Sequence, residues 1–198
     1  EITCRDWSSD VCSSDLDLWV LSGSLPPDVP EEFYADLITM INSRGAKVYL
    51  DASGAPLRYG CQAAPFLVKP NHHEAAQIVG FAIEDQEDAK RAALPFLRMG
   101  VDYFALTMGS QGLLVANQKE MAFATPPRIV AHNTTGSGDT AMAALIYAHL
   151  KEMSLVETAQ WAAATSAASV ETVGVSEFSI ERIQELLPQI EAKVINVM

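Results

Sequence analysis

Residues 136–139 read Gly-Ser-Gly-Asp and run into a stretch rich in Ala, Leu and Met. Two glycines around a serine disfavour both strand and helix, because glycine loses the most backbone freedom on folding, whereas the stretch after them favours helix. Gly136, Ser137 and Gly138 are therefore predicted to form a tight turn at a helix N-terminus, where free amide groups and the helix dipole attract anions. Asp139 would lie at this anion site as a general base that takes a proton from a bound hydroxyl.

The residues alone leave a second interpretation of Asp139 open. Aspartate is common at helix N-termini, so Asp139 could simply cap the helix. The segment matches neither of the two common glycine-rich nucleotide motifs. No lysine follows Gly138, as a P-loop requires, and Ala141 occupies the place of the third glycine of a dinucleotide-binding motif.

A second polar segment, Lys-Pro-Asn-His-His-Glu at residues 69–74, follows the apolar residues 66–68. The proline keeps Lys69 out of helical geometry, and Asn71 with Glu74 has the spacing of a capping box. Capping alone would explain the pair. The same residues could also serve a phosphate ligand, since Mg²⁺ retains several waters and needs few protein carboxylates.

The sequence offers little for a transition-metal site. His72 and His73 are adjacent, so they point in different directions on a helix, and no third ligand lies at a suitable spacing. Among the three cysteines, only Cys61 lies outside residues 1–16. Neither a disulfide framework nor a cysteine metal site is expected.

Three further glycine-containing turns follow apolar runs. They are Ser-Gly-Ser-Leu-Pro-Pro at residues 22–27, Asp-Ala-Ser-Gly at 51–54 and Thr-Met-Gly-Ser-Gln-Gly at 107–112. Each could be a plain connection. In an open α/β sheet, however, ligands bind at the carboxyl ends of the strands, where these turns would lie.

Together these segments resemble the ribokinase/PfkB family of carbohydrate kinases. Residues 134–139, 69–74 and 107–112 are similar to its Gly-Ala-Gly-Asp, Asn-x-x-Glu and Ser-Leu-Gly-x-x-Gly motifs, and 22–27 and 51–54 resemble its phosphosugar branch. That branch phosphorylates fructose 1-phosphate, tagatose 6-phosphate or fructose 6-phosphate. Ser137 replaces the usual alanine. The segments occur in family order, and the resemblance covers residues 18–198.

The resemblance implies ATP-dependent phosphorylation of a sugar phosphate, with fructose 1-phosphate converted to fructose 1,6-bisphosphate. Asp139 would be the general base, beside an anion hole of Gly136, Ser137 and Gly138. The implied nucleotide contacts are Lys69, Asn71, Thr107, Gly109, Gly112, Asn133 and Thr135. Ser24 and Asp139 would contact the substrate, and Glu74 would hold Mg²⁺ through water. Residues 163–170 would pack under the adenine. The alternatives are a tagatose-6-phosphate or fructose-6-phosphate kinase, and an inactive nucleotide-binding fragment.

The hydrophobic pattern predicts the elements that position these residues. Strands are predicted at residues 18–21, 47–51, 66–71 and 103–108, a hairpin at 112–118 and 120–125, and helices at 31–43, 74–79, 86–99, 138–150, 155–171 and 179–194. Strands alternating with helices indicate βαβ units and a mostly parallel sheet. The predicted fold is a three-layer αβα sandwich of the ribokinase-like class, without the family's N-terminal part and lid.

Length and charge limit the partners. The 198 residues suffice for one domain with a full core. The net charge of −12 argues against nucleic acid and acidic membrane surfaces, and no apolar run approaches the ~20 residues of a membrane span. A phosphosugar and ATP are the expected partners, in a reducing cytoplasm. Family members often form homodimers through the lid.

Residues 1–16 differ from the rest. They follow neither the helical nor the strand period, and they nearly repeat Ser-Ser-Asp before an apolar residue. They resemble translated sequencing-adapter read-through, so a non-native leader is expected, with a natural disordered leader as the alternative. Residues 17–198 would form the C-terminal part of a carbohydrate kinase domain.

Overall fold

The computed structural model describes residues 18–174 and 177–195, so the predicted leader at 1–16 lies outside the described residues. Within them, seven strands form one sheet in the order β1-β2-β3-β4-β5-β6-β7. The strands are β1 Leu18–Ser22, β2 Lys47–Asp51, β3 Leu67–Val68, β4 Tyr103–Thr107, β5 Leu113–Ala116, β6 Met121–Thr125 and β7 Glu191–Ile195. Their order in the sheet is their order in the chain.

The sheet is built from two kinds of pairing. Strands β1 to β4 pair in parallel, whereas β4–β5, β5–β6 and β6–β7 are antiparallel. Five of the seven described strands, β1 to β4 and β6, therefore point the same way. The prediction of a mostly parallel sheet is confirmed.

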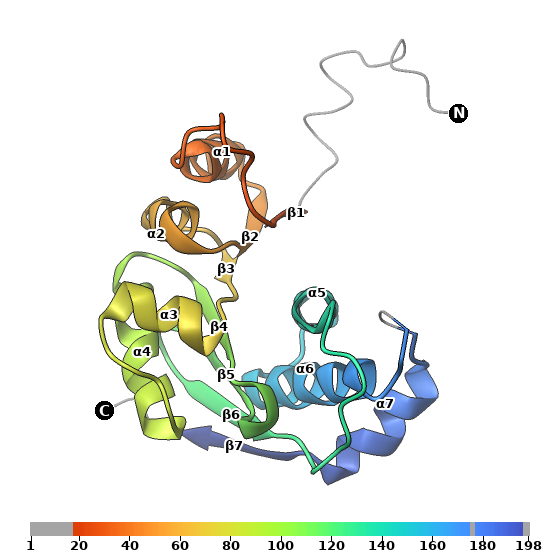
Figure 1. The fold of residues 1–198 in the computed structure, drawn as a ribbon. Helices are drawn as coiled ribbons and strands as arrows, with labels where there is room; N and C mark the ends of the chain where they lie inside the picture. Colours follow the sequence, from red (N-terminus) through yellow and green to blue (C-terminus); the bar gives the residue numbers. More distant parts are fainter. Residues whose placement is uncertain (1–17, 175–176, 196–198) are drawn as a thin grey trace.

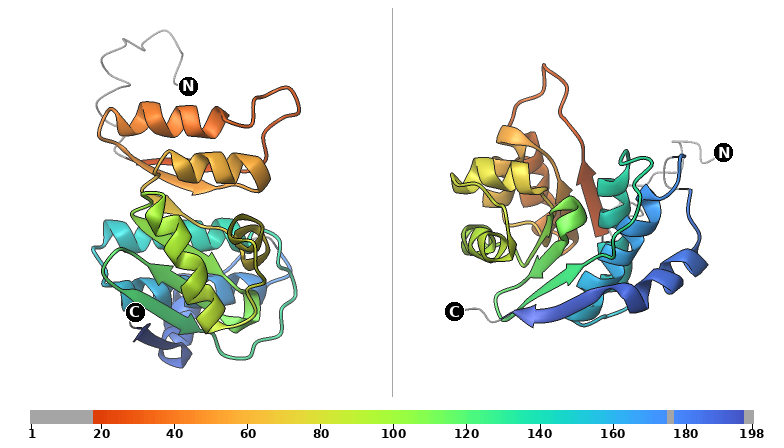
Figure 2. Two further views of the ribbon diagram at one scale, coloured as in Figure 1. Left: turned by 90° about the vertical axis from the view of Figure 1, so that its left-hand side faces the viewer. Right: turned by 60° about the horizontal axis from the view of Figure 1, so that its bottom comes forward.

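Helices cover both faces of the sheet (Figure 1; Figure 2). One face carries α1 Phe33–Asn42, α2 Gly54–Gln62, α3 His72–Val79 and α4 Gln86–Arg98; the other carries α5 Ser137–Leu150, α6 Leu155–Val170 and α7 Ile180–Leu186. In β2, Val48 and Leu50 pack into the first layer and Tyr49 into the second. This alternation between two apolar cores confirms the three-layer sandwich. Among the described helices, none combines the length and apolarity needed to cross a bilayer.

The prediction of a helix over residues 179–194 is wrong in its second half. Helix α7 ends at Leu186, a 3₁₀ turn spans Leu187–Gln189, and β7 then pairs antiparallel with β6. The proline in this turn cannot donate a helical hydrogen bond. The edge of β6 instead offers backbone partners to residues 191–195, and that tertiary pairing overrides local helix propensity.

Gly112, which directly precedes β5, should be costly to replace. Its φ is +130°, and an added Cβ would overlap the carbonyl oxygen of Ala124 and lie 2.9 Å from Phe123 Cε1. We expect Gly112→Ala to lower the free energy of unfolding by about 2–4 kcal/mol through strain and overpacking, measured by urea denaturation. Gly80→Ala is the matched control, because Gly80 also has positive φ (+78°) but open space around it. Equal losses in the two variants would contradict this account.

His149, in the last turn of α5, should make stability depend on pH. Its Nε2 lies 2.9 Å from Lys47 Nζ, and its ring packs 4.6 Å from that of Phe66. Burial, followed by the Lys47 charge, lowers the pKa of His149, and Glu152 opposes this shift. The unfolded chain therefore binds the proton more readily, so stability falls as pH drops below the ordinary histidine value of about 6.5.

Urea midpoints at pH 7.5 and 5.5 test this dependence on His149. The wild-type midpoint should be lower at the acidic pH. His149→Gln retains an acceptor for Lys47 but does not titrate, so its two midpoints should differ less. The same difference in both proteins would assign the pH dependence to other groups.

Candidate active site

A cleft of about 910 Å³ opens where the parallel strands end. The lining includes Asp51 at the end of β2, Lys69 just beyond β3, Gly109 just beyond β4 and Gly138 in the first turn of α5. These residues are far apart in sequence and meet because parallel strands bring their carboxyl ends to one edge. The cleft thus lies at the edge that the sequence indicates.

The structure brings most of the predicted site residues together. Those that line the cleft are Lys69, Asn71, Glu74, Thr107, Gly109, Gly112, Ser137 and Gly138. Those predicted but outside its lining are Ser24, Asn133, Thr135, Gly136 and Asp139. Asp139 is exposed and follows Gly138 directly, and Ser24 is exposed on the loop after β1.

The turn before α5 has the form that its glycines predict. Gly136 is the N-cap residue, with a left-handed φ of +79°, and no side chain caps the helix. The Ser137 hydroxyl donates to the Thr134 carbonyl at 2.8 Å. Asp139 is the third residue of the helix, so it does not occupy the capping position considered for it. Uncapped first-turn amides favour an anion at this end of α5.

Asn133 fastens this turn to the rest of the molecule. Its Oδ1 accepts a hydrogen bond from the Thr135 amide at 2.9 Å, and its Nδ2 donates to the Val173 carbonyl at 3.1 Å. The His132 amide also donates to the Val170 carbonyl at 2.7 Å. The segment before α5 is thus tied to the segment that follows α6.

A buried ion pair lies beneath the turn. Lys69 Nζ is 2.9 Å from Asp51 Oδ2, and the two side chains are 4% and 17% exposed. A Cβ added at Gly138 would lie 3.5 Å from the Lys69 ammonium. The pair thus places the Lys69 ammonium, with Asp51 in contact, beside the first turn of α5. Asp51 was not assigned a role from sequence, although its position at a strand end was a usable signal.

The capping box predicted at α3 is formed. Asn71 Oδ1 accepts from the amides of His73 and Glu74, each at 2.9 Å, and Glu74 Oε2 accepts from the Asn71 amide at 2.8 Å. Both residues also line the cleft. Capping uses one carboxylate oxygen of Glu74 and leaves Oε1 as a further acceptor. The two interpretations of this segment are therefore compatible.

The oxygen ligands at the cleft suit a hard cation such as Mg²⁺ that makes few direct bonds to the protein. Among residues 18–174 and 177–195, no three His, Cys, Asp or Glu side chains cluster as metal ligands. Mg²⁺ is commonly held by one or two carboxylates, waters and substrate phosphates. Glu74 therefore fits a Mg²⁺ ion that binds together with a phosphate ligand.

The part of the lining that α6 supplies is mostly apolar. Helix α6 presents Ala163, Ser166, Ala167 and Val170, and Leu113 and Ile129 also contribute to the lining. These α6 residues are spaced by three, one and three positions, so they share one helical face. The lining of the cleft thus combines the charged residues Asp51, Lys69 and Glu74 with small residues of α6. The family resemblance implied that residues 163–170 pack under the adenine, and it did not single out Ser166.

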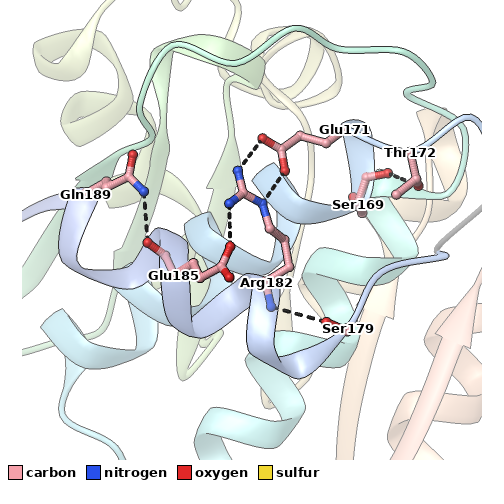
Figure 3. Close-up of polar contacts among 7 residues, drawn as sticks. All are labelled: Ser169, Glu171, Thr172, Ser179, Arg182, Glu185 and Gln189. Carbon is pink, nitrogen blue, oxygen red and sulfur yellow. Dashed lines mark hydrogen bonds and ion pairs between the residues drawn. The ribbon is translucent and has the colours of Figure 1, made fainter.

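Arg182 of α7 holds the end of α6 in place (Figure 3). Its Nε and Nη2 donate to the two carboxylate oxygens of Glu171 at 2.7 and 2.9 Å, and Nη1 donates to Glu185 at 2.7 Å. These bonds hold the pKa of Glu171 below its usual range. The segment after α6 that hydrogen-bonds to Asn133 is therefore also held by the ion pair with α7.

Comparison with known proteins decides the family. A model described as the pfkB family of carbohydrate kinases matches residues 13–182. The chain belongs to this family. The predicted family is confirmed, and the cleft described above lies within the matched region.

Curated members of the family show similarity over most of this chain. It is 35% identical over 188 residues to a 1-phosphofructokinase from Haemophilus influenzae, covering 91% of the chain and 60% of that protein. It is 31% identical to a 1-phosphofructokinase from Vibrio cholerae, covering 92% and 58%. The chain thus spans about three fifths of the length of these relatives.

Solved structures of the family have the same fold. The phosphofructokinase-2 of Escherichia coli, solved in complex with potassium, superimposes with a TM-score of 0.83 at 26% identity. The match covers 91% of this chain and 60% of that one. The ribokinase-like sandwich predicted from sequence is confirmed.

Proposed function

We propose that this chain forms the nucleotide-binding part of an ATP-dependent sugar-phosphate kinase, with fructose 1-phosphate as the favoured acceptor. The observation that carries the proposal is the cleft. It combines an uncapped helix N-terminus, a buried lysine and an apolar side, which suit the phosphates and base of a nucleotide. The preference for fructose 1-phosphate rests on relatives named 1-phosphofructokinase at 31–35% identity.

In the proposed reaction, Asp139 takes the proton from the acceptor hydroxyl while that oxygen attacks the γ-phosphorus in line. The exposure of Asp139 beside Gly138 supports this role, since the carboxylate is open to a bound substrate at the rim of the anion site. General bases contribute about 10²–10⁴-fold. Ser24, exposed at the same edge of the sheet, is a proposed contact to the sugar phosphate.

The transferred phosphoryl group would be stabilised by preorganised donors. The amides of Gly136, Ser137 and Gly138 would serve as an anion hole, in which donors are fixed before the charge develops. Lys69 would add positive charge, and Asn71, Thr107, Gly109 and Gly112 would border the phosphates. Glu74 would help to hold Mg²⁺, which would neutralise phosphate charge.

The neighbours of this turn have a supporting role in the proposal. Asn133 and Thr135 would keep the anion hole in shape through the hydrogen bond between them. Such positioning matters because phosphoryl transfer depends mainly on alignment and charge stabilisation. Since ATP and sugar phosphates are metabolites of the cytoplasm, we also propose that compartment.

One observation favours a second candidate, a nucleotide-binding chain without turnover. The match to the Haemophilus influenzae 1-phosphofructokinase covers 60% of that protein, so turnover by the whole relative is not evidence of turnover by this chain. Both candidates predict the same nucleotide site. They differ in whether the acceptor is phosphorylated.

Two measurements on the chain test these candidates. Isothermal titration with ATP and Mg²⁺ measures the nucleotide site, and a coupled assay with fructose 1-phosphate, fructose 6-phosphate and tagatose 6-phosphate measures turnover. We expect binding, with the highest kcat/KM on fructose 1-phosphate. Binding without turnover on any acceptor would favour the second candidate. Absence of ATP binding would refute both.

A further inference from the structure

Strand β1 is an edge strand without the features that usually protect an edge. It pairs with β2 on one side, and no described strand pairs with its other side. Its sequence, Leu-Trp-Val-Leu-Ser, has neither a charge nor a proline, and Trp19 and Val20 are 38% and 44% exposed. The opposite edge strand, β7, carries the exposed charges of Glu191 and Lys193. Since charged residues discourage edge pairing, β1 is the edge that is open to another strand.

Helix α1 has a flank on either side of its buried face. The residues of the buried face are Tyr34, Ile38 and Ile41. One flank faces α2, because the Asn42 side chain donates to the Ala63 and Ala64 carbonyls at 3.2 and 2.9 Å. The other flank therefore faces away from α2, on the side where β1 is the edge of the sheet. Figure 2 shows α1 as the outermost helix of its layer.

This outer flank of α1 is apolar. It carries Phe33, Leu37 and Met40, which are spaced by four and three positions and so share one helical face. Phe33 and Met40 are 41% and 43% exposed, and Leu37 is half-buried. Trp19 lies on the same face of the sheet, because it is two residues from Leu21, which packs into the same core as α1. The outer flank and Trp19 thus continue the exposed edge of β1 into the helical layer.

We propose that a second copy of this chain covers this surface, with the two β1 strands pairing antiparallel across a two-fold axis. In such a contact each copy supplies the same residues, so one apolar strand edge meets another. The two sheets join into one, and the two α1 helices lie on the same face of it. Neither β1 nor α1 lines the nucleotide cleft, so the inference does not depend on the proposed function.

A single axis serves both the strand and the helix. The Tyr34 hydroxyl, in the first turn of α1, donates to the Ser22 and Gly23 carbonyls at the end of β1, each at 3.1 Å. The helix begins where the strand ends and runs back along it, since β1 and β2 are parallel. An axis through the middle of the β1 pair therefore also passes between the two outer flanks of α1. It brings Phe33 of one copy toward Met40 of the other.

The charges at the two ends of α1 favour a copy of the same chain as the occupant. Glu31, Glu32 and Asp36 are exposed at the start of the helix, and Arg44 is exposed just after its end. Among the described residues, none of these four makes an ion pair. Antiparallel α1 helices place the acidic start of one beside the basic end of the other, and their dipoles are then also opposed.

Sedimentation velocity over a range of chain concentrations tests the contact. Salt at about 0.15 M screens the net charge of −12 beyond about 8 Å, and wild type should shift from one chain to two as the concentration rises. Val20→Lys places two ammonium groups beside the axis, so the dissociation constant of the dimer should rise roughly 10-fold or more. Val194→Lys is the matched control, because Val194 is an exposed valine of the other edge strand. Its dissociation constant should equal that of wild type.

A charge exchange tests the antiparallel arrangement of α1. Arg44→Glu, and Glu31→Arg combined with Glu32→Arg, each bring like charges together in the dimer and should weaken it roughly 3–10-fold. An equal mixture of these two proteins restores opposite charges at both ends, so it should dimerise as tightly as wild type. These exposed positions keep the test valid if far-UV circular dichroism shows that Val20→Lys does not fold.

Three results would overturn the inference. A wild type that remains one chain at every concentration would leave this edge to a different segment. Equal weakening by Val20→Lys and Val194→Lys would make added charge, and not β1, the cause. A charge-exchange mixture no tighter than its two components would exclude the antiparallel contact of α1. ATP binding, which tests the proposed function, is measured separately from all three.

Discussion

Asp139→Asn should lower turnover about 10²–10⁴-fold while ATP affinity stays nearly unchanged. The amide has almost the same shape as the carboxylate but cannot accept the proton of the sugar hydroxyl, and general bases contribute this much. Asp139 lies outside the lining of the cleft, so its loss should spare nucleotide binding. Coupled kinetics with fructose 1-phosphate measure kcat, and isothermal titration measures the ATP affinity.

Asp36→Asn is the matched control for this effect. Asp36 is also an exposed aspartate in the first turn of a helix, but it lies in α1 away from the cleft. Its variant should keep wild-type turnover. If Asp139→Asn retained more than a tenth of the wild-type kcat, Asp139 would not be the general base.

Asp51→Asn should destabilise the fold by about 3 kcal/mol, because it leaves the ammonium of Lys69 buried without a counter-charge. Lys69 as a whole residue is only 3% exposed, so water cannot easily replace the lost partner. Urea denaturation at neutral pH measures the change. ATP binding should weaken as well, since Lys69 is held beside the turn of α5 by this pair.

A double variant separates the pair from the individual residues. Asp51→Asn combined with Lys69→Met removes both charges, and replacing a buried pair by neutral groups is often nearly neutral for stability. It should therefore recover most of the stability lost in the single variant. A double variant as unstable as the sum of its singles would show that the ion pair is not the source of the loss.

Sequence patterns anticipated the features that depend on neighbouring residues. The strand at residues 47–51, the capping box of Asn71 and Glu74, and the glycine turn at Gly136 each follow from local chemistry, and the structure has all three. Alternating strands and helices also led to the sandwich. These features are encoded within a few residues of one another.

Features that depend on distant partners were missed. The pairing of Asp51 with Lys69 requires β2 and β3 to lie side by side. The local sequence of neither segment predicts this ion pair. β7 was taken for helix because its partner, β6, lies far back in the chain.

The agreement between strand order and chain order bears on how the protein emerges from the ribosome. The amino-terminal part of a chain leaves the ribosome first, and here each strand from β2 to β6 has its neighbour in the sheet synthesised before it. β7 completes the sheet later, since α5, α6 and α7 must be made before it can close onto β6. We expect nascent chains stalled only once β6 has left the exit tunnel to hold a protease-resistant β1–β6 sheet that still lacks one helical layer.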